Sequence, residues 1–583
     1  MESDSLNPPS SVHPRGLRLV LLGLFLLCVT LAAYFPSLSV RTTPEDRWLW
    51  DDWSLHSTPA LHRSDGLADF WHYPPRNELE EHYWPVTYTV FWLQARIWGM
   101  DAFAFRLTNI VLHVVNTLLL WLLLRRMQIP AAWLGALFFG IHPIHVESVA
   151  WIIELKDVLS GLFYLLAAHA YLSSTTASSH TSTQQRLGMI SCIALFVLAV
   201  WSKSVAITFP VAAALYEWWR GGMPQVRRRH RLLLGLLAIA GLLATLDLIV
   251  AMRSGRQPTE FPVVQRVALA GHAFWFYLWK LLVPYPQSLI YAKWDLAGLG
   301  ITSWIPTLLA ILVMVGVFAW QHRIGRGIPF AWAFYVITLL PTLGLIPFSY
   351  MQHAYVADRF QYLASIGPLV LLASAAVRLF QAAGNRYGRG LLAGLVGGIV
   401  VLWTWLTMQR AEMFGSAKTI LRDTVRRNPD AWVAHQMLGT IEAREGQWEE
   451  ARNHFEQALR IQPEDASLRA NLAFVLYQLG AYAQALENAE RALQLNPKSA
   501  WGLAVRGAVQ AKLGDTSAAR TDLRQALQVA PSHPFAQRIL ADLDSSPSQT
   551  QRTPASELPT TPPNHSPEDT TSSPTKALPS QSF

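Results

Sequence analysis

A cluster of ionisable residues lies within an apolar stretch of the chain, and its side chains suit acid–base and phosphate chemistry. Residues 131–172 otherwise resemble membrane-spanning sequence, but near the centre they carry His142, His145, Glu147, Glu154, Lys156 and Asp157. Ionisable groups at membrane depth are costly, so they usually face a protein interior or a wet cavity and mark a site. We therefore predict that these residues line a functional site.

The acidic pair Asp51 and Asp52, flanked by Trp50 and Trp53, is a second candidate. An apolar setting and a like-charged neighbour raise the pKa of a carboxyl group toward the range of a general base. The pair therefore predicts a residue that takes a proton from an acceptor hydroxyl. The competing interpretation is that one aspartate only caps a short surface helix that begins at Trp53.

Several basic residues lie at predicted outer membrane edges, where the charge bias of membrane proteins disfavours them. They are Lys156, Lys203, Lys280 and Arg359. Lysine and arginine neutralise a bound or departing phosphate, so as a set these cations indicate a lipid-linked phosphate. For any one of them, snorkelling to the membrane surface or a structural ion pair is the competing interpretation.

His142, His145 and Glu147 also suggest a metal site, but the sequence does not favour one. Pro143 interrupts regular helical spacing, and no recognised zinc pattern is present. We predict no metal, and no cofactor is required, because lysine and arginine can neutralise a phosphate leaving group. A divalent metal would nevertheless be compatible with this chemistry.

The composition indicates a polytopic membrane protein. The 583 residues are 51% hydrophobic and only 15% charged, with a mean hydropathy of +0.22, and the apolar residues form long runs. The net charge of +8 comes from arginines in short loops, which is typical of cytoplasmic loops, so no nucleic-acid partner is predicted. Cys28 and Cys192 both lie in predicted spans, which excludes a disulfide framework.

We predict eleven spans, each placed to within a few residues. The first has no small-residue cleavage site, so we expect a retained helix rather than a signal peptide. The spans are residues 17–38, 105–124, 131–146, 158–171, 187–200, 205–219, 232–251, 301–320, 329–347, 360–379 and 391–408.

A cytoplasmic N-terminus accounts for the positions of the loop arginines. It places Arg125, Arg126, Arg186, Arg220, Arg227 to Arg231, Arg323, Arg326, Arg386 and Arg389 on the cytoplasmic side. This topology requires residues 264–294 to form a re-entrant or surface-lying element on the outer side. The candidate residues and the loop 39–84 then face the same outer compartment.

A 34-residue period begins after residue 410. Pro429, Pro463, Pro497 and Pro531 share this spacing, as do Gly446, Gly480 and Gly514 and also Ala458, Ala492 and Ala526. The period predicts tetratricopeptide repeats, with a leading helix at 417–428 and a capping helix at 534–543. Their concave face would bind an extended peptide or a partner helix, and a spacer or self-association role is the alternative.

These patterns divide the chain into three parts. Residues 1–410 form the transmembrane domain with its outer loop 39–84, residues 411–545 form the repeat domain, whose repeats end at Pro463, Pro497 and Pro531, and residues 546–583 form a disordered tail rich in Ser, Thr and Pro. The tail also contains Asn564 in a lone glycosylation sequon. The predicted fold class is all-α, a polytopic helix bundle followed by an α-solenoid.

The block His142-Pro-Ile-His-Val-Glu-Ser-Val-Ala-Trp, followed by Glu154-Leu-Lys-Asp-Val-Leu-Ser-Gly, resembles a signature of bacterial multispan proteins with tetratricopeptide repeats. These are related to the eukaryotic transmembrane and tetratricopeptide-repeat O-mannosyltransferases of the GT-C glycosyltransferase superfamily. Further pieces resemble the same family in the same order: Tyr83-Trp-Pro, Leu107-Thr-Asn with Leu112-His, Trp201-Ser-Lys, Tyr277-Leu-Trp-Lys and Ala357-Asp-Arg-Phe-Gln-Tyr-Leu.

The resemblance implies a GT-C-like enzyme that moves a hexose, with mannose as one candidate, from a polyprenyl-phosphate donor to a hydroxyl of a protein or peptide. It implies that Asp51 and Asp52 are the paired catalytic acids of the first outer loop, and that Lys156, Asp157, Asp358 and Arg359 border the cavity. Together with the charges at the outer membrane edge, this predicts that Lys156, Lys203 and Arg359 contact the donor phosphate. Supporting cavity residues would be His82, His142, His145, Glu147, Asp157 and Asp358. Leu155 departs from the family pattern, in which an arginine is common, and leaves Lys156 as the only cation of its block.

The resemblance also implies a location in a bacterial inner membrane with extracytoplasmic repeats, or in the endoplasmic reticulum with lumenal repeats if the source is eukaryotic. Two other classes remain open. A non-catalytic membrane-anchored scaffold would serve extracytoplasmic assembly, and Asp51 and Asp52 would then be dispensable. A transporter is disfavoured because the charges gather toward one face instead of the midplane, and the chain shows no paired halves.

Overall fold

The computed structural model describes residues 14–39, 43, 45–74, 82–176, 182–253, 262–295 and 301–545. Within these ranges every regular element is an α-helix or a 3-10 helix, which confirms the all-α prediction. The chain divides into two compact units, one built mainly from residues up to Ser416 and the other mainly from Ala417 onward. The predicted tail, with its sequon, and residues 75–81 of the outer loop lie outside the described residues.

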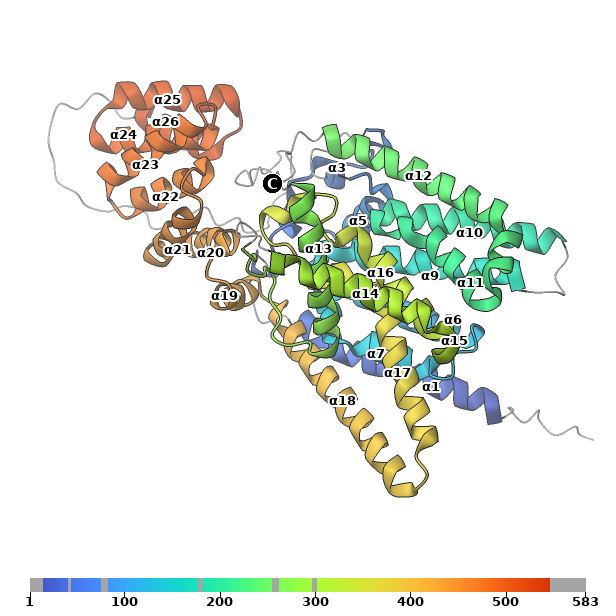
Figure 1. The fold of residues 1–583 in the computed structure, drawn as a ribbon. Coiled ribbons are helices and arrows are strands. Elements are labelled where there is room, and N and C mark those ends of the chain that lie inside the picture. The colour runs from blue at the N-terminus through green and yellow to red at the C-terminus, as the bar shows by residue number, and fades with distance from the viewer. Residues whose placement is uncertain are drawn as a thin grey trace, which may run out of the picture. The chain divides into compact units, whose positions relative to one another are not determined.

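The first unit is a bundle of long helices joined by short irregular and 3-10 segments (Figure 1). The α-helices described up to Met413 are α1 (Pro14–Tyr34), α2 (Asp52–Ser57), α3 (Pro59–His62), α4 (Leu67–Trp71), α5 (Pro85–Trp98), α6 (Ala102–Arg126), α7 (Ala132–Ile141), α8 (Val146–Ala150), α9 (Leu155–Thr176), α10 (Ser182–Ser202), α11 (Phe209–Arg228), α12 (His230–Arg253), α13 (Val263–Leu282), α14 (Ile305–Ala319), α15 (Gln321–Ile324), α16 (Gly327–Leu339), α17 (Ile366–Ala382) and α18 (Arg386–Met413).

Among the described residues, seven helical segments are long and apolar enough to cross a membrane, and each coincides with a predicted span. They are residues 16–38, 102–126, 152–175, 183–202, 230–253, 302–319 and 386–413. A chain with this many such helices is a multi-pass membrane protein.

The four other predicted spans are shorter or interrupted. Instead of a continuous helix over 131–146, α7 ends at Ile141, because His142 is extended and Pro143 cannot continue the hydrogen-bond ladder. Residues 205–219 begin as the 3-10 helix η5 (Ser204–Thr208). The span predicted at 329–347 leaves α-helical geometry after Leu339, and the one at 360–379 becomes α-helical only from Ile366. These irregular ends carry many of the candidate residues.

Residues 264–294, predicted to be re-entrant or surface-lying, contain the regular 20-residue helix α13. The following residues 283–295 form no regular element. Helix α13 is not among the seven long apolar segments.

A close approach in the bundle joins α9 to the segment after Arg359. A Cβ atom on Gly161 would lie 2.8 Å from Cε1 of Tyr362, so only glycine lets the two segments pack this tightly. The contact joins the second turn of α9 to Tyr362, the residue directly after the 3-10 helix η9 (Asp358–Gln361).

The second unit contains the expected helix pairs. Helix α19 (Ala417–Arg427) leads, and the pairs α20 (Trp432–Arg444) with α21 (Trp448–Ile461), α22 (Ala466–Gln478) with α23 (Tyr482–Leu495), and α24 (Ala500–Leu513) with α25 (Thr516–Val529) precede the terminal α26 (Pro534–Ser545). Gly446, Gly480 and Gly514 follow the first helix of each pair with φ of 76°, 78° and 94°, which explains the periodic glycine. The periodic Ala458, Ala492 and Ala526 are fully buried where the helices meet.

Candidate functional site

The candidate site is built on the irregular ends of the interrupted spans. Helix α8 supplies Glu147, the turn from η4 (Ile152–Glu154) into α9 supplies Glu154, Lys156 and Asp157, and η9 supplies Arg359. Lys203 lies in the break between α10 and η5. Non-helical backbone at membrane depth occurs where it is buried in protein or lines a cavity, so these breaks are a structural signature of a site.

The six charged side chains form one connected network. Glu154 is its centre: Oε1 lies 3.1 Å from Nε of Arg359 and 3.7 Å from Nζ of Lys156, while Oε2 lies 3.3 Å from Nζ of Lys203. Lys203 also contacts Asp157 at 2.6 Å, and Ser148 donates to the same aspartate at 2.9 Å. The network thus brings together residues that are more than 200 positions apart in the sequence.

Arg359 lies at one end of the network, against aromatic rings. Its Nη1 contacts a carboxylate oxygen of Glu147, and its guanidinium lies 4.2 Å from the ring centre of Tyr350 and 5.1 Å from that of Trp151. Three carboxylates and three cations therefore neutralise one another. A buried charge is tolerated when it is paired and hydrogen-bonded in this way.

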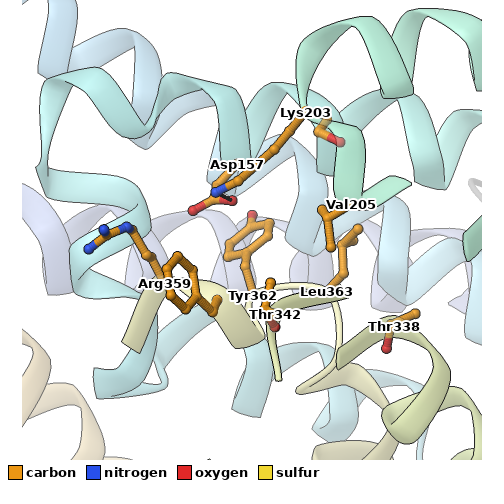
Figure 2. Close-up of a pocket in the computed structure, with 10 residues that line it drawn as sticks. Asp157, Lys203, Val205, Thr338, Thr342, Arg359, Tyr362 and Leu363 are labelled. Carbon is orange, nitrogen blue, oxygen red and sulfur yellow. Dashed lines mark hydrogen bonds and ion pairs between the residues drawn. The ribbon is translucent and has the colours of Figure 1, made fainter. Parts of the chain in front are cut away.

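A narrow cavity opens beside the network (Figure 2). Its volume is about 10 Å³, which leaves room for roughly one water molecule. Its lining comes from α9, from η5 and the residue before it, from α16 and the turn after it, and from η9 and the two residues that follow, and consists of Asp157, Ser160, Lys203, Val205, Thr338, Thr342, Arg359, Phe360, Tyr362 and Leu363. Asp51, Asp52 and Lys156 are not among these residues, and a cavity of this volume is too small for a sugar ring.

The loop with the acidic pair is fastened to the network segment by hydrogen bonds. Oδ2 of Asp52 accepts from the backbone N–H of Leu49 at 2.9 Å, and Oδ1 accepts from that of Ile153 at 2.8 Å. Arg106 donates to the carbonyls of Ala150 and Arg47. Asp52 is fully buried, and its role in this fastening is structural.

Burial also raises the pKa of Asp52 to about 7, because its removal from water outweighs the two backbone N–H groups and the charge of Arg106, which lower it. The neighbouring Asp51 is exposed, and its side chain makes no capping bond to α2. The two adjacent acids therefore occupy different environments.

Trp50 is held in a strained backbone conformation directly before Asp51. Its φ is 43°, which is a genuine outlier for a bulky side chain. Its ring stacks on Trp151 with centroids 6.0 Å apart and lies 6.2 Å from Tyr350, so it packs on two of the rings that contact Arg359. Strain of this kind persists only where surrounding contacts enforce it, and it concentrates at functional sites.

Lys156 and His82 both contact the ring of Trp84. Nζ of Lys156 is 5.2 Å from the ring centre of Trp84, and the His82 ring stacks on Trp84 at 4.6 Å. His82 contacts Asp247 at 2.9 Å, and Ser204 links that aspartate to the indole N–H of Trp84. This arrangement connects the outer loop to the break that carries Lys203.

The two histidines of the sequence cluster bind backbone groups. His142 contacts the carbonyl of Leu281 at 3.1 Å, and His145 lies between the carbonyl of Phe139 and the hydroxyl of Ser365. Both are fully buried and hold the break after α7. Asp358 is 2% exposed and begins η9. Within the described part of the chain, no group of three His, Cys, Asp or Glu side chains is arranged to hold a metal ion.

Sequence reasoning did not single out Arg106, Asp247, Trp151 or Tyr350. The signal for the first two was present, because both are charged residues inside predicted spans, and that rule had identified the main cluster. The two aromatic rings carry no comparable signal. Only the folded chain shows that they face Arg359.

Comparisons with known proteins support a relation that covers most of the chain. The tetratricopeptide-repeat family model matches residues 429–498. The chain is 24% identical to the Homo sapiens protein O-mannosyl-transferase TMTC1 over 72% of this chain and 53% of that protein, and 23% identical to the Drosophila melanogaster protein O-mannosyl-transferase Tmtc3 over 70% and 51%. It is 34% identical to the Drosophila melanogaster protein O-mannosyl-transferase Tmtc1 over 24% of this chain and 16% of that protein.

Among solved structures, the Arabidopsis OM64 TPR domain is 23% identical over 20% of this chain and 94% of that chain, with a TM-score of 0.19. The chain spans about half the length of the first two curated relatives. It is related to proteins named O-mannosyl-transferases and carries tetratricopeptide repeats, as its sequence motifs predicted.

Proposed function

We propose that this protein is a membrane glycosyltransferase that moves a hexose, with mannose as the first candidate, from a polyprenyl-phosphate donor to a hydroxyl of a protein or peptide. The observation that carries the proposal is the buried network of Glu154, Arg359, Lys203 and Asp157 beside the strained loop of Trp50 and Asp51. The relation to O-mannosyl-transferases supports the same reaction class.

The two acids of the outer loop take different roles in this proposal. Asp51 is the general base, because its carboxylate is exposed and follows the residue that packs against the network. Asp52 is a positioning residue, since both of its oxygens accept backbone N–H groups. The exposed carboxylate takes the proton of the acceptor hydroxyl.

The acceptor oxygen then attacks the anomeric carbon from the face opposite the phosphate. A new carbon–oxygen bond forms, the bond from the anomeric carbon to the phosphate oxygen breaks, and the polyprenyl phosphate leaves with the bonding electrons. The configuration at the anomeric carbon is inverted. Lys156, Lys203 and Arg359 neutralise the phosphate, so the reaction needs no metal.

A non-catalytic scaffold is the second candidate, and one observation favours it. Lys156, Lys203 and Arg359 all contact carboxylates, and the cavity holds roughly one water molecule. A donor phosphate would have to replace a carboxylate at one of these cations. The repeats would then bind a peptide or partner protein for an assembly function.

The proposed location is a bacterial inner membrane, with the N-terminus in the cytoplasm and with both the network and the repeats facing the outer compartment. The loop arginines support this orientation through the positive-inside bias. In a eukaryotic cell the corresponding location would be the endoplasmic reticulum, with lumenal repeats.

The test is transfer by the purified protein from a panel of polyprenyl-phosphate hexoses to a Ser/Thr-containing peptide. Lys156→Gln should lower kcat/KM for the donor by about 10²-fold, the usual loss when one electrostatic contact to the reacting group is removed. Lys498→Gln, which removes an exposed lysine of the second unit, is the charge-matched control and should leave transfer unchanged. Absence of transfer from every donor, with the protein folded, would favour the scaffold.

A further inference from the structure

A second cavity lies at the arginine-rich end of the helix bundle, away from the ion-pair network. Its volume is about 320 Å³, and it is lined by Thr175, Tyr216, Glu217, Arg220, Gly221 and Gln225. Thr175 is the last residue of the apolar segment 152–175, so the cavity lies at the level where that segment would leave the membrane. The proposed transfer reaction does not use it.

The carboxylate of Glu217 forms the floor of this cavity and is only partly satisfied. Glu217 is 2% exposed, and Oε1 accepts the hydroxyl of Tyr171 at 2.8 Å. Within the described residues, its other oxygen receives no hydrogen bond, and it is not among the fully buried polar atoms that lack a partner, so it keeps some exposed surface. A buried carboxylate oxygen of this kind requires a donor from a ligand or from water.

Arg220 supplies the opposite charge at the mouth of the cavity. It is exposed and follows Glu217 by three residues on α11, a spacing that normally allows an ion pair. No such pair forms among the described residues; instead the guanidinium lies 5.9 Å from the ring centre of Trp219. A carboxylate and a guanidinium therefore line one cavity without neutralising each other.

The backbone keeps this cavity open. Gly222 has φ of 69°, which an L-residue with a side chain rarely adopts, and the resulting kink redirects α11 so that Gln225 closes one side. Beside the cavity, Arg229 donates to the carbonyl of Thr175 at 2.9 Å and fixes the end of α9.

We propose that this cavity binds the phosphoethanolamine headgroup of a membrane lipid. The ammonium group would donate to the open oxygen of Glu217, and the phosphate would contact Arg220. A headgroup with both charges satisfies both residues, whereas inorganic phosphate would leave the buried carboxylate without a donor.

The test compares two lipids whose headgroups differ by three N-methyl groups, which remove the ammonium hydrogen-bond donors and enlarge the headgroup. The full-length protein is reconstituted with equal amounts of phosphatidylethanolamine and phosphatidylcholine, purified, and analysed by native mass spectrometry for retained lipid. We expect the wild type to retain phosphatidylethanolamine about tenfold over phosphatidylcholine, since choline cannot donate to Glu217. Glu217→Gln should bring this ratio near one while keeping an acceptor for Tyr171.

Arg220→Gln, a surface change that should not impair folding, should lower retention of both lipids. Arg186→Gln removes an exposed arginine from the start of the neighbouring α10 and is the matched control. Equal retention of the two lipids by the wild type, or the same loss in Arg186→Gln as in Arg220→Gln, would overturn the proposal. Displacement of the lipid by soluble phosphoethanolamine at an equal concentration would instead assign the cavity to a soluble ligand.

Discussion

Asparagine substitutions at the two adjacent acids should have opposite effects on activity and stability. Asp51 is exposed, so Asp51→Asn should change the free energy of unfolding by less than about 0.5 kcal/mol. If its carboxylate is the general base, transfer should fall by about 10²- to 10⁴-fold. Asp52 is fully buried and accepts two backbone N–H groups. The amide of Asp52→Asn can accept only one of them, so a buried donor is left unsatisfied at a cost of about 1–3 kcal/mol.

The assay measures two properties of each purified variant. Hexose transfer to a peptide reports catalysis, and thermal unfolding in detergent reports stability. Asp51→Asn should melt with the wild type and fail to transfer, whereas Asp52→Asn should melt earlier and retain partial transfer at low temperature. Asp69→Asn, in the same outer loop, is the control for loss of one carboxylate.

The reasoning would be refuted by either of two results. Transfer by Asp51→Asn within a few-fold of the wild type would remove the general base from this position. Full stability with complete loss of transfer in Asp52→Asn would mean that the buried acid, not the exposed one, takes part in the reaction.

Three further predictions follow from buried groups. In the folded protein Asp52 stays protonated up to about pH 7, whereas in the unfolded chain it loses its proton near pH 4. The stabilisation from this proton is therefore full below pH 4 and falls by about 4 kcal/mol as the pH rises to 7. In Asp52→Asn, the free energy of unfolding measured against pH should no longer show this decrease. Glu154→Gln leaves the buried Lys203 and Arg359 and the half-buried Lys156 without their shared carboxylate and should cost about 3–5 kcal/mol by thermal unfolding, whereas the exposed Glu464→Gln should cost nothing measurable. Gly161→Ala places a methyl group 2.8 Å from Tyr362 and should destabilise the protein by about 1–3 kcal/mol, and an unchanged melting temperature would show that the segment after η9 moves freely.

The sequence alone determined the fold class and the repeats because both depend on local, periodic patterns. Long apolar runs predict helices that cross a membrane wherever they occur, and seven of the predicted spans are such helices. The 34-residue period fixed the repeat helices to within a few residues, since each repeat folds mainly against its neighbours.

Only the tertiary structure decided how the ends of the other spans are used. Hydropathy averages over a window and does not register that His142 and Pro143 end a helix early or that Lys203 lies in a break. The ion pairs of Glu154 join segments that are distant in the sequence, so no local pattern could specify them. The same holds for the difference between Asp51 and Asp52: the two residues are identical in type and adjacent in sequence, and only packing makes one buried and the other exposed.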